Sequence, residues 1–212
     1  MGAINAYQFD RGVARVSLSR VSCGQRSHDC FASLIHSIHA IEEDSRVSAA
    51  YFALCGGETP PEGTDETASP VDGNEESDGT AGLPRLFKEI RDFPLPLVST
   101  IEGRVSLKDA AAFLASDVVL MDCEAEITIE ETKAELDDIA SLLKRRLTPE
   151  LASTLRAGRR LSARDALAAR LCDFVAPASE LSSMAVSLAG RLGSGPGEML
   201  TLIQAEARLA RS

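Results

Sequence analysis

Two histidines, His36 and His39, lie three residues apart in a stretch whose apolar residues repeat every three to four positions. That spacing would place both imidazoles on one side of a helix, where the pair could bind a metal ion. The sequence suggests no third ligand by its spacing, so we expect two solvent-exposed histidines and no metal. The glycine motifs that cradle phosphates, Gly-x-x-x-x-Gly-Lys-Ser/Thr and Gly-x-Gly-x-x-Gly after a strand, do not occur, so no phosphate loop is indicated.

The cysteines could in principle form disulfides or bind metal. Their number is odd, they are widely spaced and no Cys-x-x-Cys occurs, which predicts reduced thiols in a cytoplasmic protein. Cys55 ends a predicted buried strand and is expected to be a core thiol. The five cysteines are Cys23, Cys30, Cys55, Cys123 and Cys172.

The overall composition is that of an acidic globular protein. The chain has 212 residues, with 32 Asp and Glu against 22 Lys and Arg, and a formal net charge of −10. The length fits one domain that can bury a full core, and the acidic balance argues against a general binder of nucleic-acid backbones. No apolar run approaches the ~18–20 residues that a membrane span needs, and Met1–Tyr7 lacks the features of a secretory signal.

Apolar periodicity predicts strands that alternate with helices, which indicates an α/β layered fold with a helical C-terminal third. Phe9–Arg20 is predicted as a hairpin, and Val47–Cys55 as a strand buried on both faces because its apolar run is nearly continuous. The other predicted strands are Leu97–Glu102, Asp117–Met121 and Ala125–Ile129, and the predicted helices are Asp29–Asp44, Leu83–Ile90, Lys108–Ser116, Lys133–Arg146, Pro149–Gly158, Ala163–Arg170, Leu181–Leu192 and Glu198–Arg211.

Charge is distributed unevenly along the chain. Gly56–Gly82 carries eight acidic residues and no Lys or Arg, and its Gly, Pro, Ser and Thr content predicts a mobile loop. Lys144–Arg170 carries eight basic residues against two acidic ones. We interpret this basic segment either as a solvated helical face, which could pair with the acidic loop of a neighbouring subunit, or as a docking surface for an acidic partner or a phosphorylated ligand.

Three segments occur in an order and spacing that resembles the crotonase (enoyl-CoA hydratase/isomerase) superfamily. Val47–Asp65 is similar to the family's buried strand and the acidic turn that follows it. Pro94–Gly103 resembles Pro-x-Pro-x-Ile-Ala-x-Val-x-Gly and continues without a gap to Glu131. Leu161–Val175 is close to Ile-Ser-Ala-x-Glu-Ala-x-x-x-Gly-Leu-Val-Asp-x-Val. The resemblance spans most of residues 8–207.

This resemblance implies an α/β fold, a crotonase-like ββα spiral with C-terminal helices. The expected core covers residues 1–180, with the mobile acidic loop at about 58–82, and a C-terminal helical segment covers residues 181–212. Family members assemble as trimers or pairs of trimers, so we expect a homotrimer or hexamer, with a crotonase paralogue as an alternative partner. The resemblance also implies no tightly bound cofactor and no metal, with CoA or phosphopantetheine carrying the substrate as a thioester.

Within the superfamily, the chain most resembles the dehydratases of polyketide β-branching cassettes. The similarity lies in the frame from Glu102–Val105 to Ala115–Val119, and in Leu142–Arg146, which matches their segment after the catalytic loop. Those enzymes act on 3-hydroxy-3-methylglutaryl groups held on an acyl carrier protein. The resemblance therefore implies an acyl-CoA or an acyl carrier protein as partner, and neither a nucleic acid nor a membrane.

Family members stabilise a thioester enolate with two backbone N–H groups, an oxyanion hole. The resemblance assigns these donors to Glu62 and Lys108. The second donor of the family lies in a Gly-Gly-rich turn at the start of a helix, where free N–H groups favour negative charge. In this chain the turn is Leu107-Lys108-Asp109 and contains no glycine, so it departs from the family pattern at the second donor.

Hydratases of the family also use two glutamates, and the resemblance places them at Ala111 and Glu131. Alanine cannot transfer a proton, although the β-branching dehydratases also lack an acid there. Glu131 could act as a general acid/base, or it could be a surface glutamate at the start of the acidic helix Glu130–Asp138. Asp109 is a further acid near the turn and an auxiliary candidate. The family's Gly- and Pro-containing loop is replaced by Thr132–Ile139, which has neither residue.

Two functions follow from these residues. The first is a lyase that dehydrates an acyl thioester, with Glu131 as acid/base and the Glu62 and Lys108 amides as oxyanion donors. The second is a catalytically degenerate homologue that binds or assembles with an active paralogue or a carrier protein, which the glycine-free turn and Ala111 favour. The sequence does not determine the acyl group or its carrier.

Overall fold

The structure of the chain is a computed structural model that describes residues 7–19, 27–56, 82–129, 131–143 and 160–195. A large sheet of six strands forms its centre. The first two strands pair antiparallel and all the other neighbours pair in parallel. In spatial order the strands are β1 (Gln8–Asp10), β2 (Val13–Ser19), β3 (Ala49–Cys55), β4 (Leu97–Glu102), β6 (Val118–Asp122) and β9 (Phe174–Ala176).

A second, three-stranded sheet contains β5 (Arg104–Ser106), β7 (Glu126–Thr128) and β8 (Leu161–Ser162). The chain alternates between the two sheets, because β4 leads into β5 and then α3 (Leu107–Leu114), and β6 leads into β7 and then α4 (Lys133–Leu142). Each unit therefore contains one strand of each sheet followed by a helix. This arrangement confirms the predicted α/β fold built from ββα units.

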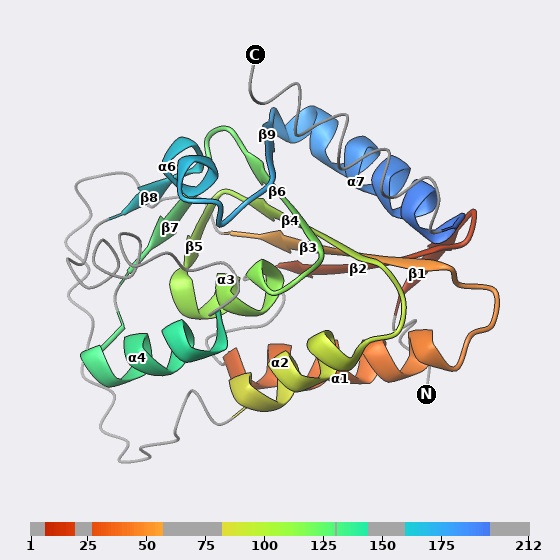
Figure 1. Cartoon of the computed structure of the whole chain (residues 1–212), viewed down its shortest axis with the longest axis horizontal. Coiled ribbons are helices and arrows are strands. Elements are labelled where there is room, and N and C mark those ends of the chain that lie inside the picture. The colour runs from red at the N-terminus through yellow and green to blue at the C-terminus, as the bar shows by residue number, and fades with distance from the viewer. Residues whose placement is uncertain (1–6, 20–26, 57–81, 130, 144–159, 196–212) are drawn as a thin grey trace.

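The helices form layers on both sides of the large sheet. Helices α1 (Ser27–Glu42), α2 (Leu83–Asp92) and α3 lie on one side, and α7 (Ala178–Gly193) covers the other side (Figure 1). The short helix α6 (Ala163–Ala168) follows β8 and packs next to β9. Within the described residues, no helix combines the length and the apolar character that crossing a bilayer requires.

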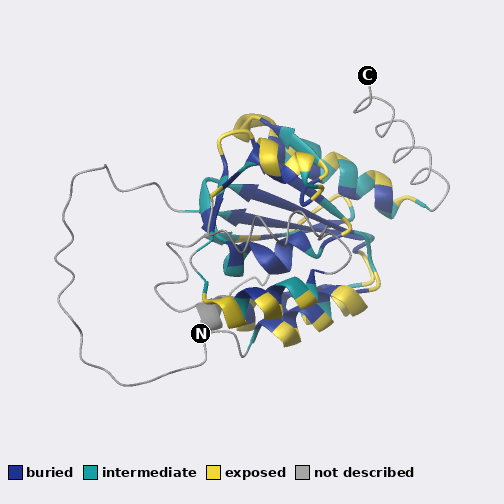
Figure 2. Cartoon of the chain, turned by 60° about the vertical axis from the view of Figure 1, so that its left-hand side comes forward, coloured by how far each residue is buried: buried dark blue, intermediate teal, exposed yellow. Residues whose placement is uncertain are grey.

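Strand β3 lies inside the large sheet and is buried on both faces, which is why its sequence is an almost continuous apolar run. Figure 2 shows the strands buried between the helical layers, whose outer faces are exposed. Alternate side chains of β3 enter two different cores: Ala50, Phe52 and Leu54 pack beneath α1 to α3, and Ala49, Tyr51 and Ala53 pack beneath α7. The predicted strand is confirmed, but Cys55, its last residue, is half-buried and not the fully buried core thiol that was expected.

The chain passes from the large sheet to the small one at Gly103, between β4 and β5. Gly103 has a φ of +68°, a left-handed conformation that side chains other than glycine rarely adopt. The backbone of Gly56 crosses here, and a Cβ on Gly56 would lie 2.2 Å from the carbonyl oxygen of Arg104. This close crossing brings the end of β3 against the start of β5, which leads into α3.

Most predicted elements are present, with ends that differ by a few residues. The hairpin is confirmed as β1 and β2 around Arg11-Gly12, and the predicted helices within the described residues are found. The short strands β5, β8 and β9 were not predicted. Several predictions fall outside the described residues. They are the acidic loop 58–82, apart from residue 82, and the helices at Pro149–Gly158 and Glu198–Arg211. The part of the basic segment before Arg160 also lies outside them.

Candidate functional site

The site begins at the N-terminus of α3, directly after β5. Ser106 is the N-cap residue, and its hydroxyl oxygen accepts a hydrogen bond of 3.1 Å from the backbone N–H of Asp109. The first amides of a helix have no partner within the helix and carry the positive end of its dipole. The amide of Lys108 is one of these groups, so it is available to an acceptor from another element.

The pairing of β5 with β7 supplies that acceptor. The two strands are parallel and in register from Arg104–Glu126 to Ser106–Thr128, and the hydroxyl of Thr128 donates to the carbonyl oxygen of Val105 at 3.2 Å. Because parallel strands end at the same edge of a sheet, the residues after β5 and after β7 leave the sheet side by side. The start of α3 and the start of α4 therefore meet, although 23 residues separate Lys108 from Glu131 in the sequence.

The carboxylate of Glu131 accepts a hydrogen bond from the backbone N–H of Lys108, with 2.8 Å between the nitrogen and Oε1. An ionised acceptor at a helix N-terminus forms a charge-assisted hydrogen bond, which is stronger than a neutral one. The structure thus brings together two of the residues that sequence analysis selected. It also shows that the amide expected to bind a substrate oxygen is bound to a carboxylate of the chain itself.

Lys108 contacts the start of α4 a second time through its side chain. Its ammonium nitrogen lies 3.8 Å from Oε1 of Glu135, and the two side chains are 18% and 32% exposed. The other oxygen of Glu135 accepts from the backbone N–H and the hydroxyl of Thr132, at 2.8 Å each. Sequence analysis missed Glu135. The signal was present as a capping box, in which Thr132 is followed three residues later by Glu135.

The other predicted site residues lie as follows. Ala111 is fully buried in α3 and offers no group for proton transfer. Asp109 is half-buried, one residue beyond Lys108. Glu62, the predicted first oxyanion donor, lies outside the described residues. In the described part of the site, Glu131 is the predicted residue whose carboxylate lies beside the predicted amide donor, that of Lys108.

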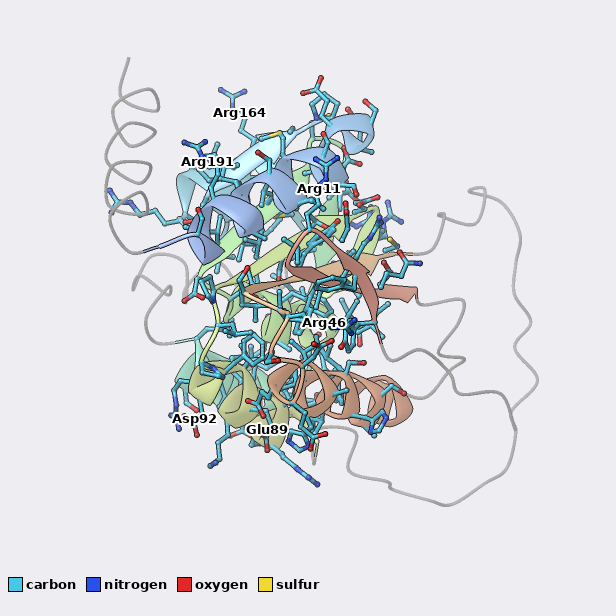
Figure 3. The ribbon with its side chains drawn as sticks, turned by 90° about the vertical axis from the view of Figure 1, so that its right-hand side faces the viewer. Arg11, Arg46, Glu89, Asp92, Arg164 and Arg191 are labelled. Carbon is cyan, nitrogen blue, oxygen red and sulfur yellow. The ribbon has the colours of Figure 1, made fainter. Side chains whose placement is uncertain are left out.

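His36 and His39 are both exposed on α1. Nε2 of His39 lies 3.3 Å from Oε2 of Glu89 on α2, and Figure 3 shows Glu89 and Asp92 on the outer surface of that helix, far from Arg164 and Arg191. Among the residues that the structure describes, no three His, Cys, Asp or Glu side chains are grouped to bind a metal ion. His39 therefore links the surfaces of α1 and α2 through Glu89.

A second polar group lies on the opposite face of the large sheet, where α7 packs. Burial, followed by the charge of Asp122, raises the pKa of Glu102 above its ordinary value. Burial also raises the pKa of the Cys55 thiol, with a further contribution from Glu102. The guanidinium of Arg15 lies 5.4 Å from the ring centre of Tyr51, within cation–π range. Both pKa shifts are upward, because burial disfavours the charged form of each group.

A cavity of about 920 Å³ lies at the far end of α3, between α2, the last residues of α4 and the segment around Arg170. Its walls mix apolar side chains, such as Phe87, Ile90 and Leu114, with charged ones, such as Lys88 and Arg91. None of its lining residues is Lys108 or Glu131. This cavity is therefore separate from the amide–carboxylate contact at the start of α3.

The comparisons with known proteins agree with this architecture. The family model for enoyl-CoA hydratase/isomerase matches residues 8–210. A Thermus thermophilus protein, provisionally named an enoyl-CoA hydratase, is 29% identical over 178 residues, which cover 80% of this chain and 70% of that protein.

Solved structures show the same fold. A Pseudomonas aeruginosa protein superposes with a TM-score of 0.71 at 25% identity, and the match covers 100% of this chain and 93% of that one. An enoyl-CoA hydratase from Mycobacterium smegmatis superposes with a TM-score of 0.66 at 17% identity, covering 94% of this chain and 82% of that one.

Proposed function

Because this chain belongs to the enoyl-CoA hydratase/isomerase family, we propose that it is a lyase that dehydrates an acyl thioester, with Glu131 as its acid/base. The observation that supports this proposal is the 2.8 Å contact between the Glu131 carboxylate and the Lys108 amide. A thioester whose carbonyl oxygen reaches that amide has its α-carbon next to the carboxylate. This is the arrangement that proton abstraction beside a carbonyl requires.

The proposed reaction uses one carboxylate twice. Glu131 removes the α-proton of a 3-hydroxyacyl thioester, and the electron pair moves to the thioester oxygen as an enolate. The Lys108 amide, together with that of Glu62, stabilises this charge. The enolate then re-forms the carbonyl and expels the 3-hydroxyl group, which takes the proton from Glu131 and leaves as water. Because Ala111 cannot carry a proton, no second side chain at that position shares the task.

The proposed substrate class rests on a sequence resemblance: the segment from Glu102 to Val119 is similar to the dehydratases of polyketide β-branching cassettes. We propose a 3-hydroxy-3-methylglutaryl-type acyl group on an acyl carrier protein of polyketide biosynthesis, or a related acyl-CoA. The thioester arrives on CoA or phosphopantetheine, and the acid–base steps require no other cofactor. By analogy with the family, the working form is a homotrimer or hexamer.

The test is turnover of 3-hydroxyacyl thioesters on CoA and on a carrier protein by the full-length wild type and Glu131→Gln. Glutamine keeps the size of the side chain but cannot shuttle a proton, so turnover should fall about 10²- to 10⁴-fold. Asp138→Asn removes an exposed carboxylate from α4, the helix that follows Glu131, and serves as the matched control, with turnover unchanged. Equal turnover in wild type and Glu131→Gln would remove Glu131 from the mechanism.

The same hydrogen bond also favours a second function, because it occupies the amide that a substrate oxygen would need. The Lys108 amide is already bound, and the buried Ala111 replaces an acid. We propose, as the alternative, a degenerate homologue that assembles with an active paralogue or a carrier protein. Co-purification with a second crotonase and no turnover by the isolated chain would support this alternative, and robust turnover by the isolated chain would contradict it.

A further inference from the structure

Lys108 holds the start of α4 at two points. Its backbone N–H donates to Glu131, and its ammonium group faces Glu135. We propose that Lys108 is a two-point clamp that keeps the site closed until an acyl thioester displaces Glu131 from the Lys108 amide. The inference rests on the proposed function, because it assigns a resting state to the same site.

The first step of the argument is competition for one donor. A backbone N–H has a single hydrogen, and at 2.8 Å the Glu131 carboxylate takes the position that a thioester oxygen would need. The next amide of the turn, that of Asp109, is already donated to Ser106. A thioester therefore reaches the Lys108 amide by exchange with Glu131.

The second step is what holds Glu131 in place. Glu135 binds both the N–H and the hydroxyl of Thr132, the residue that directly follows Glu131. Its remaining oxygen faces the ammonium of Lys108, and both side chains are largely shielded from water. The first turn of α4 is thus fixed by its capping box and tied to α3 by the lysine side chain.

The third step explains why this chain has a lysine in the turn. The family pattern places glycine there, and glycine would supply the amide without the ammonium group. The lysine keeps the amide and adds the contact with Glu135. In the clamp, substrate binding and activation of the base are one event, because the thioester oxygen that takes the amide also releases the carboxylate for proton transfer.

The clamp is tested by isothermal titration of the full-length chain with butyryl-CoA, a thioester without a 3-hydroxyl group to eliminate. Free CoA is the matched ligand, since it lacks the carbonyl that competes with Glu131. Removal of the competing carboxylate in Glu131→Ala should raise the affinity ratio of butyryl-CoA to CoA about 10-fold. Glu135→Gln, which loosens the clamp but keeps Glu131, should raise it about 2-fold, and Asp138→Asn should leave it unchanged.

The outcomes separate the clamp from the proposed function. An affinity ratio equal in wild type, Glu131→Ala and Glu135→Gln would overturn the clamp while leaving thioester binding intact. A raised ratio together with unchanged turnover in Glu131→Gln would support the clamp and overturn the lyase. Failure of every variant to bind butyryl-CoA would overturn both. If Glu131→Ala does not fold, the affinity ratio of butyryl-CoA to CoA in Glu135→Gln still tests the clamp, and a ratio equal to that of the wild type would overturn it.

Discussion

Arg104 and Glu126 are the first residues of two neighbouring strands, β5 and β7, and their side chains form an ion pair with 2.9 Å between Nη2 and Oε2. The Nε of Arg104 donates to the same oxygen at 3.1 Å. This pair lies at the beginning of the two strands whose far ends lead to Lys108 and to Glu131. It therefore helps to set the register on which the site depends.

We expect the Arg104–Glu126 pair to contribute a coupling energy of about 0.5–1 kcal/mol, because both side chains are partly solvated. The measurement is a double-mutant cycle with Arg104→Met and Glu126→Gln, followed by urea unfolding. A coupling energy of zero would show that backbone pairing alone sets this register.

Replacement of Ala111 by glutamate should not simply restore a two-carboxylate site. Ala111 is fully buried in α3, and an added carboxylate without a partner there should lower the free energy of unfolding by about 2–4 kcal/mol. Ala168→Glu on the exposed side of α6 is the control and should change stability little. Wild-type stability in Ala111→Glu would mean that solvent or a basic group reaches this position.

The raised pKa of Glu102, which burial and then Asp122 cause, predicts a pH dependence of stability. The folded chain holds this proton more tightly than the unfolded chain, so the contribution to stability is present below the ordinary pKa and is lost as pH rises through the raised pKa. As the pH rises above the ordinary glutamate pKa of about 4.3, the wild type should lose stability relative to Glu102→Gln, which cannot titrate. Urea unfolding at several pH values measures this difference, and parallel curves for the two proteins would contradict it.

Two glycines of α7 should respond to alanine in opposite directions. A Cβ on Gly193 would lie 2.7 Å from Oγ and 2.8 Å from the carbonyl oxygen of Ser48, so Gly193→Ala should destabilise the fold by about 1–3 kcal/mol. A Cβ on Gly190 would meet only Val13, at 3.8 Å, and Gly190→Ala should stabilise the helix by about 0.5–1 kcal/mol. Thermal unfolding of both variants tests the pair, and equal shifts would show that α7 moves away from Ser48.

The sequence was sufficient for the long elements and for the family. The apolar run of β3 and the three-to-four-residue spacing in α1 and α2 report burial directly, because side-chain periodicity follows backbone geometry. The strands β5, β8 and β9 have only two or three residues each, which is too short for a periodic signal. They exist because neighbouring strands supply their hydrogen-bond partners.

For the site, the residue types were readable from the sequence, while their contacts were decided by the tertiary structure. Resemblance to a family selected Lys108 and Glu131, but only the parallel pairing of β5 with β7 places them in hydrogen-bond contact. The position of Glu135 beside the Lys108 ammonium was likewise set by the tertiary structure, which brings the first turn of α4 to the start of α3. The physical reason is that local preferences act over a few residues, whereas hydrogen bonds between distant segments form only after the sheets have fixed where those segments meet.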